Sequence, residues 1–280
     1  MSWMRSPQLI AAGNFFFRYR SALFPVIGLF ALLFATPRFA FGDRTADAYM
    51  DLLGAAIAMA GQVLRAITIG YEYIVRGGRE GKVYADNLVQ GGVFAHCRNP
   101  MYLGNLLIVA GVAVMFNSAP MYFIALPFFI FAYFAIIAAE ENFLRAKFGA
   151  PYEDYCNRVS RLWIHWKGFR SSTQGMHLNW RRLLIREYGT TFRLLVGFIA
   201  IRAYTLFMNL NAPVWPQIEP LLWWLVPIVA LYGVVRFLKK SGRLTEYPAA
   251  RSQPPQGASP DEQATQRANP SASPERPAQP

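Results

Sequence analysis

The stretch RNPMYLGNLLIVAGVAVMFNSAPMYFIALPFFIFAYFAIIAAEE, residues 98–141, decides the fold. It contains two apolar runs, 101–116 and 120–139, each near the ~20 residues that a helix needs to cross a bilayer. Only the short link 117–119 separates them. Because so short a link joins neighbouring antiparallel helices, the stretch predicts a tight helical hairpin. The polar residues at its two ends are then expected to lie on the same side of the membrane.

The composition of the whole chain agrees with a membrane protein. Its 280 residues are 54% hydrophobic and only 16% charged, whereas soluble domains are about 25% charged. We therefore expect an all-α, polytopic membrane helical bundle with about six transmembrane helices. The predicted spans are residues 21–36, 51–71, 101–116, 120–139, 191–210 and 220–238. Pro127 and Pro227 fall inside spans and are expected to kink them.

Lys and Arg gather on one side of these spans. They precede the first span, fill the loops after the second and fourth spans, and follow the sixth, whereas the opposite loops hold only Arg38 and Arg44. The positive-inside rule then places both termini and the two large loops in the cytoplasm. We predict an integral protein of a cytoplasmic membrane, in which the net charge of +12 reflects topology rather than nucleic-acid binding.

The chain divides by composition into four parts. Residues 140–155 have apolar side chains at helical spacing and predict an amphipathic helix that follows the fourth span along the membrane surface. No small-residue cleavage site closes the first apolar run, so we expect a retained anchor. The predicted parts are an N-terminal segment with the first span (1–50), a core (51–170), a C-terminal pair of spans (171–247) and a disordered, proline-rich tail (248–280).

Cysteine and histidine residues give no sign of a disulfide or a metal site. Cys97 and Cys156 lie beside basic and polar stretches rather than in an extracellular framework. The three histidines, His96, His165 and His177, lack metal-ligand spacing. We therefore predict no metal.

Two polar clusters stand at the same end of the predicted hairpin. Arg98 and Asn99 precede Pro100, and a Pro in the first turn leaves backbone N–H groups and the positive end of the helix dipole available to an anion. Glu140 and Glu141 end the second helix and attract cations. A ligand with both a carboxylate and a nearby cation, such as a zwitterionic sulfonium cofactor, would fit between the clusters. The alternative is a set of structural ion pairs, in which Arg98 binds one of the glutamates or Glu141 binds Arg145.

These residues resemble a known family, the integral-membrane methyltransferases that include isoprenylcysteine carboxyl methyltransferase and phosphatidylethanolamine N-methyltransferase. The family pattern is a Gly-x-aromatic, then Arg-His/Asn-Pro-x-Tyr-x-Gly, a helical hairpin, and a Glu-Glu pair followed by a Leu, Phe-Gly and two-Tyr pattern with a basic end. The resemblance covers about residues 88–161. The matching residues are Gly92, Phe94, Arg98, Asn99, Pro100, Tyr102, Gly104, Glu140, Glu141, Leu144, Phe148, Gly149, Tyr152, Tyr155, Val159 and Arg161.

The resemblance implies that S-adenosylmethionine binds at the polar end of the hairpin, without a Rossmann fold. It implies an adenosine pocket formed by Leu88, Val89, Gly92 and Phe94. It also implies that Asn99, Pro100 and Tyr102 approach the methionine part of the cofactor. By the same analogy Glu140 and Glu141 hold the ribose or the ammonium group, and Arg98 joins them as a catalytic residue.

The chain departs from the prenylcysteine enzymes at two positions. Asn99 replaces their His and resembles the phosphatidylethanolamine branch. Those enzymes also carry a carboxylate-binding Arg four residues before the first Glu, where this chain has Ile136. Arg65 and Arg202, which lie in or near predicted spans, are the candidates to replace it in binding the substrate.

We expect a methyltransferase whose acceptor arrives from the lipid. A phospholipid amine is the first expectation for that acceptor, followed by an isoprenylcysteine-type carboxylate, and an amine would need Glu140, Glu141 or His96 as proton acceptor. The alternatives are a small-thiol S-methyltransferase and a non-catalytic membrane scaffold on the same fold. The sequence leaves the oligomeric state open.

Overall fold

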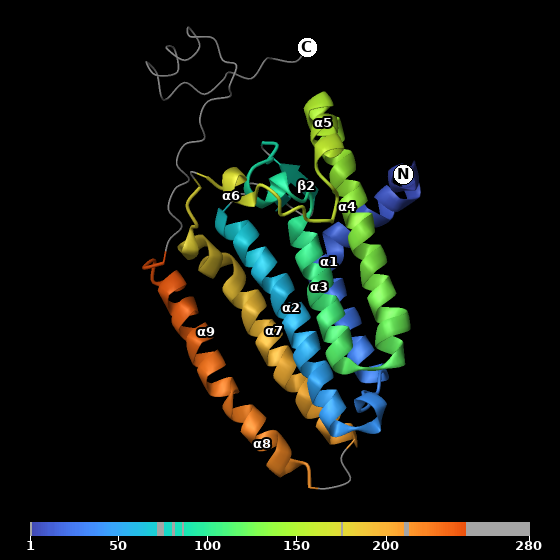
Figure 1. Cartoon of the computed structure of the whole chain (residues 1–280), viewed down its shortest axis with the longest axis vertical. Coiled ribbons are helices and arrows are strands. Elements are labelled where there is room, and N and C mark those ends of the chain that lie inside the picture. Colours follow the sequence, from blue (N-terminus) through green and yellow to red (C-terminus); the bar gives the residue numbers. More distant parts are fainter. Residues whose placement is uncertain are drawn as a thin grey trace, which may run out of the picture. The chain divides into compact units, whose positions relative to one another are not determined.

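The computed structural model describes residues 2–71, 76–79, 82–85, 87–174, 176–209 and 213–244. Residues 1–246 form one compact unit, in which long helices run side by side (Figure 1). The predicted tail, 248–280, lies outside the described residues, and the other predicted domain boundaries stay predictions. The helices of at least nine residues are α1 (Pro7–Phe34), α2 (Arg44–Tyr71), α3 (Pro100–Phe116), α4 (Leu126–Phe148), α5 (Ala150–Arg158), α7 (Trp180–Asn209), α8 (Trp215–Trp223) and α9 (Leu225–Lys240).

Shorter elements connect these helices. A small antiparallel hairpin, β1 (Arg76–Arg79) with β2 (Lys82–Ala85), follows α2. The short helices are η1 (Ser2–Arg5), η2 (Ala40–Gly42), η3 (Gly92–Ala95), the π-helical turn η4 (Met121–Ala125) and α6 (Phe169–Ser172). The hairpin, η3 and α6 lie near the end of the bundle where α3 begins and α4 ends (Figure 1). We call this end the site end.

The described helices confirm the all-α membrane bundle. By length and composition, the stretches Arg44–Tyr71, Met121–Phe148, Trp180–Asn209 and Trp215–Lys240 could each cross a membrane. They contain the predicted second and sixth spans and all but one residue of the fourth and of the fifth. The third predicted span is the shorter apolar helix α3, and residues 21–34 of the first lie in α1. The total of six spans and their orientation stay predictions.

Glycine pairs set the close contact between α2 and α3. A Cβ added to Gly61 would lie 2.4 Å from the carbonyl oxygen of Gly104, and one added to Gly104 would lie 2.7 Å from that of Gly61. Gly54 and Gly111 repeat the arrangement one heptad away, at 2.5 and 2.3 Å. Small residues let membrane helices approach at the backbone, so this contact holds the start of α3 against α2.

Aromatic side chains fill the interface between α1 and α4. Phe16 contacts Phe128 edge-on at 5.8 Å between ring centroids, and Phe24 contacts Phe129 and Tyr133 in the same way at 5.3 and 5.4 Å. Edge-to-face pairs at such separations add to the stabilisation from apolar burial. The helix α4, which carries the two glutamates, is therefore fixed against α1 as well as within the hairpin.

Local backbone features set three helix ends, of which the first differs from the sequence prediction. The amphipathic helix predicted over 140–155 is two helices, α4 and α5, because Gly149 adopts a left-handed φ of 58° between them. The hairpin turns at Asn117, which has φ of 43° and ends α3. The last predicted span breaks at Trp224, where Pro227 cannot donate the backbone hydrogen bond that would continue the helix. The η4 turn lies just before Pro127, the other predicted kink.

Candidate active site

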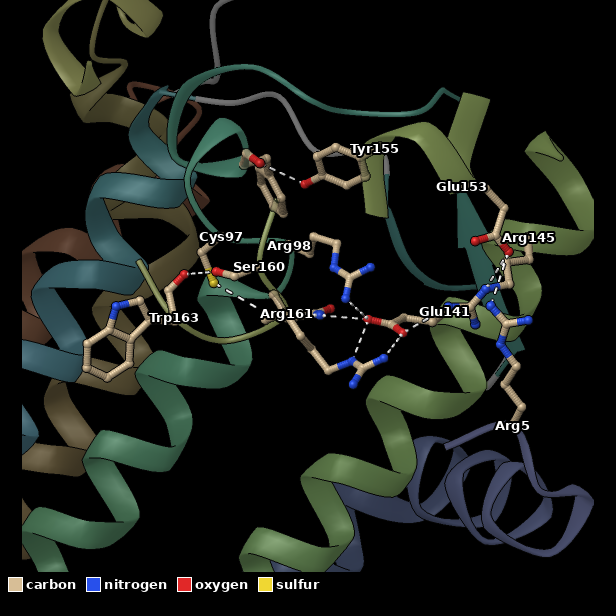
Figure 2. Close-up of polar contacts among 12 residues, drawn as sticks. Arg5, Cys97, Arg98, Glu141, Arg145, Glu153, Tyr155, Ser160, Arg161 and Trp163 are labelled. Carbon is tan, nitrogen blue, oxygen red and sulfur yellow. Dashed lines mark hydrogen bonds and ion pairs between the residues drawn. The ribbon is translucent and has the colours of Figure 1, made fainter. Parts of the chain in front are cut away.

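Glu141 lies at the centre of the polar cluster at the site end. Its side chain is 1% exposed and faces three guanidinium groups (Figure 2). Arg161 makes the closest pair, with Nε and Nη2 at 2.9 and 2.8 Å from the two carboxylate oxygens. Arg145 and Arg98 follow at 3.4 and 3.6 Å. The ion pairs that the sequence analysis gave as the alternative to a ligand site are thus present, and they neutralise the charge of Glu141 within the protein.

The segment after α5 closes over the start of α3. The backbone N–H of Arg98 donates to the carbonyl of Ser160 at 2.9 Å, and Asn99 Nδ2 donates to the carbonyl of Arg161 at 3.2 Å. Bonding to Glu141 raises the pKa of Arg161 above its usual value, which keeps the guanidinium charged. Three chain segments distant in sequence therefore meet at one carboxylate.

Glu140 has a different environment from its neighbour. Its Oε1 accepts a hydrogen bond from the Tyr102 hydroxyl at 2.5 Å, and the Tyr102 ring lies 5.9 Å from that of Tyr133. Glu140 is 4% exposed. The structure thus brings the predicted residues of the Arg98–Tyr102 turn together with both glutamates, as the short hairpin link required.

Two buried polar atoms in this cluster have no hydrogen-bond partner among the described residues. They are Arg98 Nε, a donor, and Asn99 Oδ1, an acceptor. Asn99 precedes Pro100, the first residue of α3, and its side chain does not cap the helix. Unsatisfied buried polar atoms are costly, and a donor beside an acceptor matches a ligand that carries both a carboxylate and an ammonium group. The residues present therefore fit the zwitterionic methionine part of S-adenosylmethionine.

The predicted adenosine residues lie beside this cluster. Gly92 starts η3 with φ of 54°, and Phe94 is 3% exposed. The carbonyl of Phe94 accepts a hydrogen bond from Tyr155 at 2.7 Å (Figure 2). Leu88 packs on the apolar cluster around Tyr155, whereas Val89 is half-buried. Their predicted role as a pocket stays a prediction.

Cys97 and His96 have structural contacts that the sequence did not indicate. Burial raises the pKa of the Cys97 thiol to about 11, so this residue stays protonated and is a poor nucleophile near neutral pH. His96 Nε2 lies 2.7 Å from Ser172 Oγ, and Nδ1 contacts the carbonyl of His165. These contacts hold the segment before α7 against η3 and occupy both ring nitrogens of the proposed base.

The two arginines predicted to bind substrate are paired with carboxylates of the chain. Arg65 Nη2 lies 2.7 Å from Glu187, and Arg202 Nη1 lies 2.5 and 2.8 Å from Asp47 and Asp51. Both pairs join α2 to α7, at opposite ends of α2. Carboxylates of the chain therefore balance the charges of both arginines in the absence of a substrate. The two arginines do not converge on one site.

Sequence reasoning assigned no role to Arg161, although the residue closes the family pattern. The structure makes Arg161 the closest partner of Glu141. One signal in the sequence could have indicated this contact. It is a basic residue at a fixed distance after the segment that carries Tyr152 and Tyr155.

Comparisons with known proteins support a membrane methyltransferase. Residues 50–151 match the family model described as phospholipid methyltransferase. A probable protein-S-isoprenylcysteine O-methyltransferase of Oryza sativa is 27% identical over 40% of this chain and 59% of its own length. No solved structure matches.

Other relatives carry metal-resistance names. The cobalt-zinc-cadmium resistance protein CzcN of Cupriavidus metallidurans is 27% identical over 60% of this chain and 75% of its own length. The nickel-cobalt-cadmium resistance protein NccN of Alcaligenes xylosoxydans is 28% identical over 46% and 55%. Among the described residues, no group of three or more His, Cys, Asp or Glu side chains is placed to hold a metal ion.

The family match covers α3, most of α2, and α4 with the Glu140–Glu141 pair, and it includes Arg98 but not Arg161. Through this segment, the chain is similar to the integral-membrane methyltransferases.

Proposed function

We propose that this protein is an S-adenosylmethionine-dependent methyltransferase that acts on an amphiphile of the bilayer. The observation that carries the proposal is the pair of buried, unpartnered polar atoms, Arg98 Nε and Asn99 Oδ1, at the uncapped start of α3. The family match and the apolar helices support a membrane methyltransferase. The basic residues near the site end favour an orientation in which that end and both termini face the cytoplasm.

When bound, the cofactor supplies an electrophilic methyl group for in-line displacement. The chain's own residues hold and orient the reactants. Arg98 and Asn99 would bind the carboxylate and ammonium groups, and Glu141 keeps Arg98 in place. Because three arginines already neutralise Glu141, we assign it this positioning role rather than that of a base.

Glu140 is the better candidate for a proton acceptor. Its Oε1 accepts a hydrogen bond from the Tyr102 hydroxyl, and a carboxylate there can take a proton from an amine acceptor. A carboxylate or thiolate acceptor would need no base. The consequence of Glu140→Gln therefore distinguishes the acceptor classes.

The test is methyl transfer by the purified protein in lipid nanodiscs. Labelled S-adenosylmethionine is supplied with phosphatidylethanolamine, with S-farnesylcysteine or with a soluble alkanethiol. We expect label in phosphatidylethanolamine, and a loss of about 10²-fold or more in Glu140→Gln. Label in S-farnesylcysteine or the thiol, unaffected by that substitution, would instead assign the carboxylate or thiol class. Absence of label in every acceptor would contradict the enzyme and favour the scaffold alternative.

A further inference from the structure

An apolar cavity lies between α1 and α7, over the hairpin that α3 and α4 form. Its volume is about 430 Å³, within the range of small-molecule sites. α1 packs on α4, and α7 packs on α2, α3 and α9, so the cavity occupies the space that α1 and α7 leave between them. Its apolar lining includes Val109, Phe116, Met121, Phe129, Ala200 and Tyr204. Phe116 and Met121 lie beside the hairpin turn, so the cavity extends away from the site end.

Two glycines keep this cavity wide. Gly28 of α1 and Gly197 of α7 both line it, and a Cβ added to either would meet no heavy atom within 4 Å. The glycines between α2 and α3 differ, because there the opposite backbone fills the space. Voids larger than a water molecule are few in protein interiors. An apolar space of this size in a membrane bundle is therefore expected to hold hydrocarbon.

Arg193 is the charged side chain among the described residues that line the cavity. Its side chain is exposed, and its Nη2 donates to Thr190 Oγ1 at 3.4 Å. Among the described residues, no carboxylate forms an ion pair with it, whereas Arg65 and Arg202 each pair with carboxylates of the bundle. The guanidinium at the edge of the cavity therefore has a charge that an anion can complement.

The place of Arg193 along α7 suits the phosphate of a lipid. The fifth predicted span begins at residue 191, so Arg193 lies near the headgroups of the leaflet on the side of the site end. A Cβ added to Gly189 would lie 3.6 Å from Arg193 Nη1, so the guanidinium lies back along the helix toward those headgroups. From Arg193 to Tyr204, α7 advances about 16 Å at about 1.5 Å per residue. This length matches half of the ~30 Å hydrocarbon core, which is the depth that one acyl chain reaches.

We propose that the cavity binds one phospholipid that is not the methyl acceptor. Its phosphate lies on the Arg193 guanidinium, and one acyl chain fills the space between α1 and α7. Of the described residues that line the cavity, none belongs to the polar cluster at the site end. Phe129, which lines the cavity from α4, is about three helical turns from Glu140. The bound lipid joins α1 to α7, which both lie outside the family match, and the inference does not depend on the proposed function.

The experiment titrates the delipidated, full-length protein with lipid and measures bound lipid by native mass spectrometry. The probe is phosphatidylglycerol, which has a phosphate but no amine, carboxylate or thiol to accept a methyl group. Diacylglycerol is the matched lipid without the phosphate. We expect one tightly bound phosphatidylglycerol per chain and weaker binding of diacylglycerol.

Substitutions of Arg193 test the phosphate contact. We expect Arg193→Gln to weaken phosphatidylglycerol binding about tenfold or more, Arg193→Lys to restore part of it, and diacylglycerol binding to be the same in all three proteins. The matched control is Arg236→Gln. Arg236 is also exposed, and its Nη1 lies 3.4 Å from the Tyr232 hydroxyl, but it does not line this cavity. Unchanged phosphatidylglycerol affinity in Arg193→Gln, or an equal loss in Arg236→Gln, would overturn the inference.

Gly197→Leu tests the cavity itself. The new side chain occupies the space of the acyl chain, so we expect the binding of both lipids to be lost. The control Gly233→Leu, whose side chain meets open space on α9, should retain it. Because Leu has a higher helix propensity than Gly, neither substitution is expected to lower the melting temperature of the lipid-free protein. Retention of tight binding in Gly197→Leu, or competition between phosphatidylglycerol and the acceptor in the methyl-transfer assay, would overturn the inference.

Discussion

Replacing Glu141 by Gln tests whether this carboxylate is the structural centre of the site end. The substitution keeps the size of the side chain but removes the negative charge that Arg98, Arg145 and Arg161 share. Removal of one partner from a buried ion pair costs about 3–5 kcal/mol. Because the Arg145 and Arg161 side chains are 18% exposed and water screens them, we expect the lower figure, about 3 kcal/mol.

The assay is the apparent melting temperature of the purified protein in nanodiscs. For chains of this size a loss of about 3 kcal/mol lowers the melting temperature by roughly 6–12 °C. The matched control is Glu153→Gln. Glu153 also pairs with Arg145, at 3.0 Å, but its side chain is 42% exposed, so its loss costs less than about 1 kcal/mol. A Glu141→Gln shift no larger than that of Glu153→Gln would refute the reasoning.

Two further predictions concern helix packing and thiol reactivity. Gly61→Ala places a methyl group against the Gly104 carbonyl and is expected to lower the free energy of unfolding by about 1–3 kcal/mol. The control Gly233→Ala, whose new methyl group meets open space, is expected to leave the melting temperature within about 2 °C of the wild type. Equal shifts in melting temperature for the two variants would contradict the α2–α3 contact. The Cys97 thiol, with its pKa near 11, stays protonated below that pH and should resist alkylation by iodoacetamide at pH 8 until the protein is denatured. Mass spectrometry of labelled peptides measures this, and labelling of native Cys97 as fast as a free thiol would be inconsistent with its burial.

The hairpin and the meeting of its polar ends could be predicted because they depend on local sequence. A three-residue link leaves the two helices one arrangement, and that arrangement puts Arg98 beside Glu141. The identity of Arg161 as the closest partner of Glu141 could not be predicted in the same way. It depends on how the chain returns after Gly149 and α5, which tertiary packing decides.

Helix ends were also beyond the sequence pattern. Hydropathy reports which residues suit lipid, not where a helix begins. α1 starts at Pro7 and α7 at Trp180, well before the predicted spans at 21 and 191, because their first turns pack against the bundle. The partners of Arg65 and Arg202 were missed for a related reason, since each pairs with a residue more than a hundred positions away.

The most direct test of the central claim is equilibrium binding of S-adenosylhomocysteine to the purified protein. The account predicts saturable binding to the wild type, retained in the control Arg18→Gln, whose side chain is exposed on α1. It predicts binding weakened about tenfold or more in Asn99→Ala, because a charge-assisted hydrogen bond is lost. Absence of saturable binding to the wild type, or equal affinity in Asn99→Ala, would contradict a methyl-donor site at the start of α3.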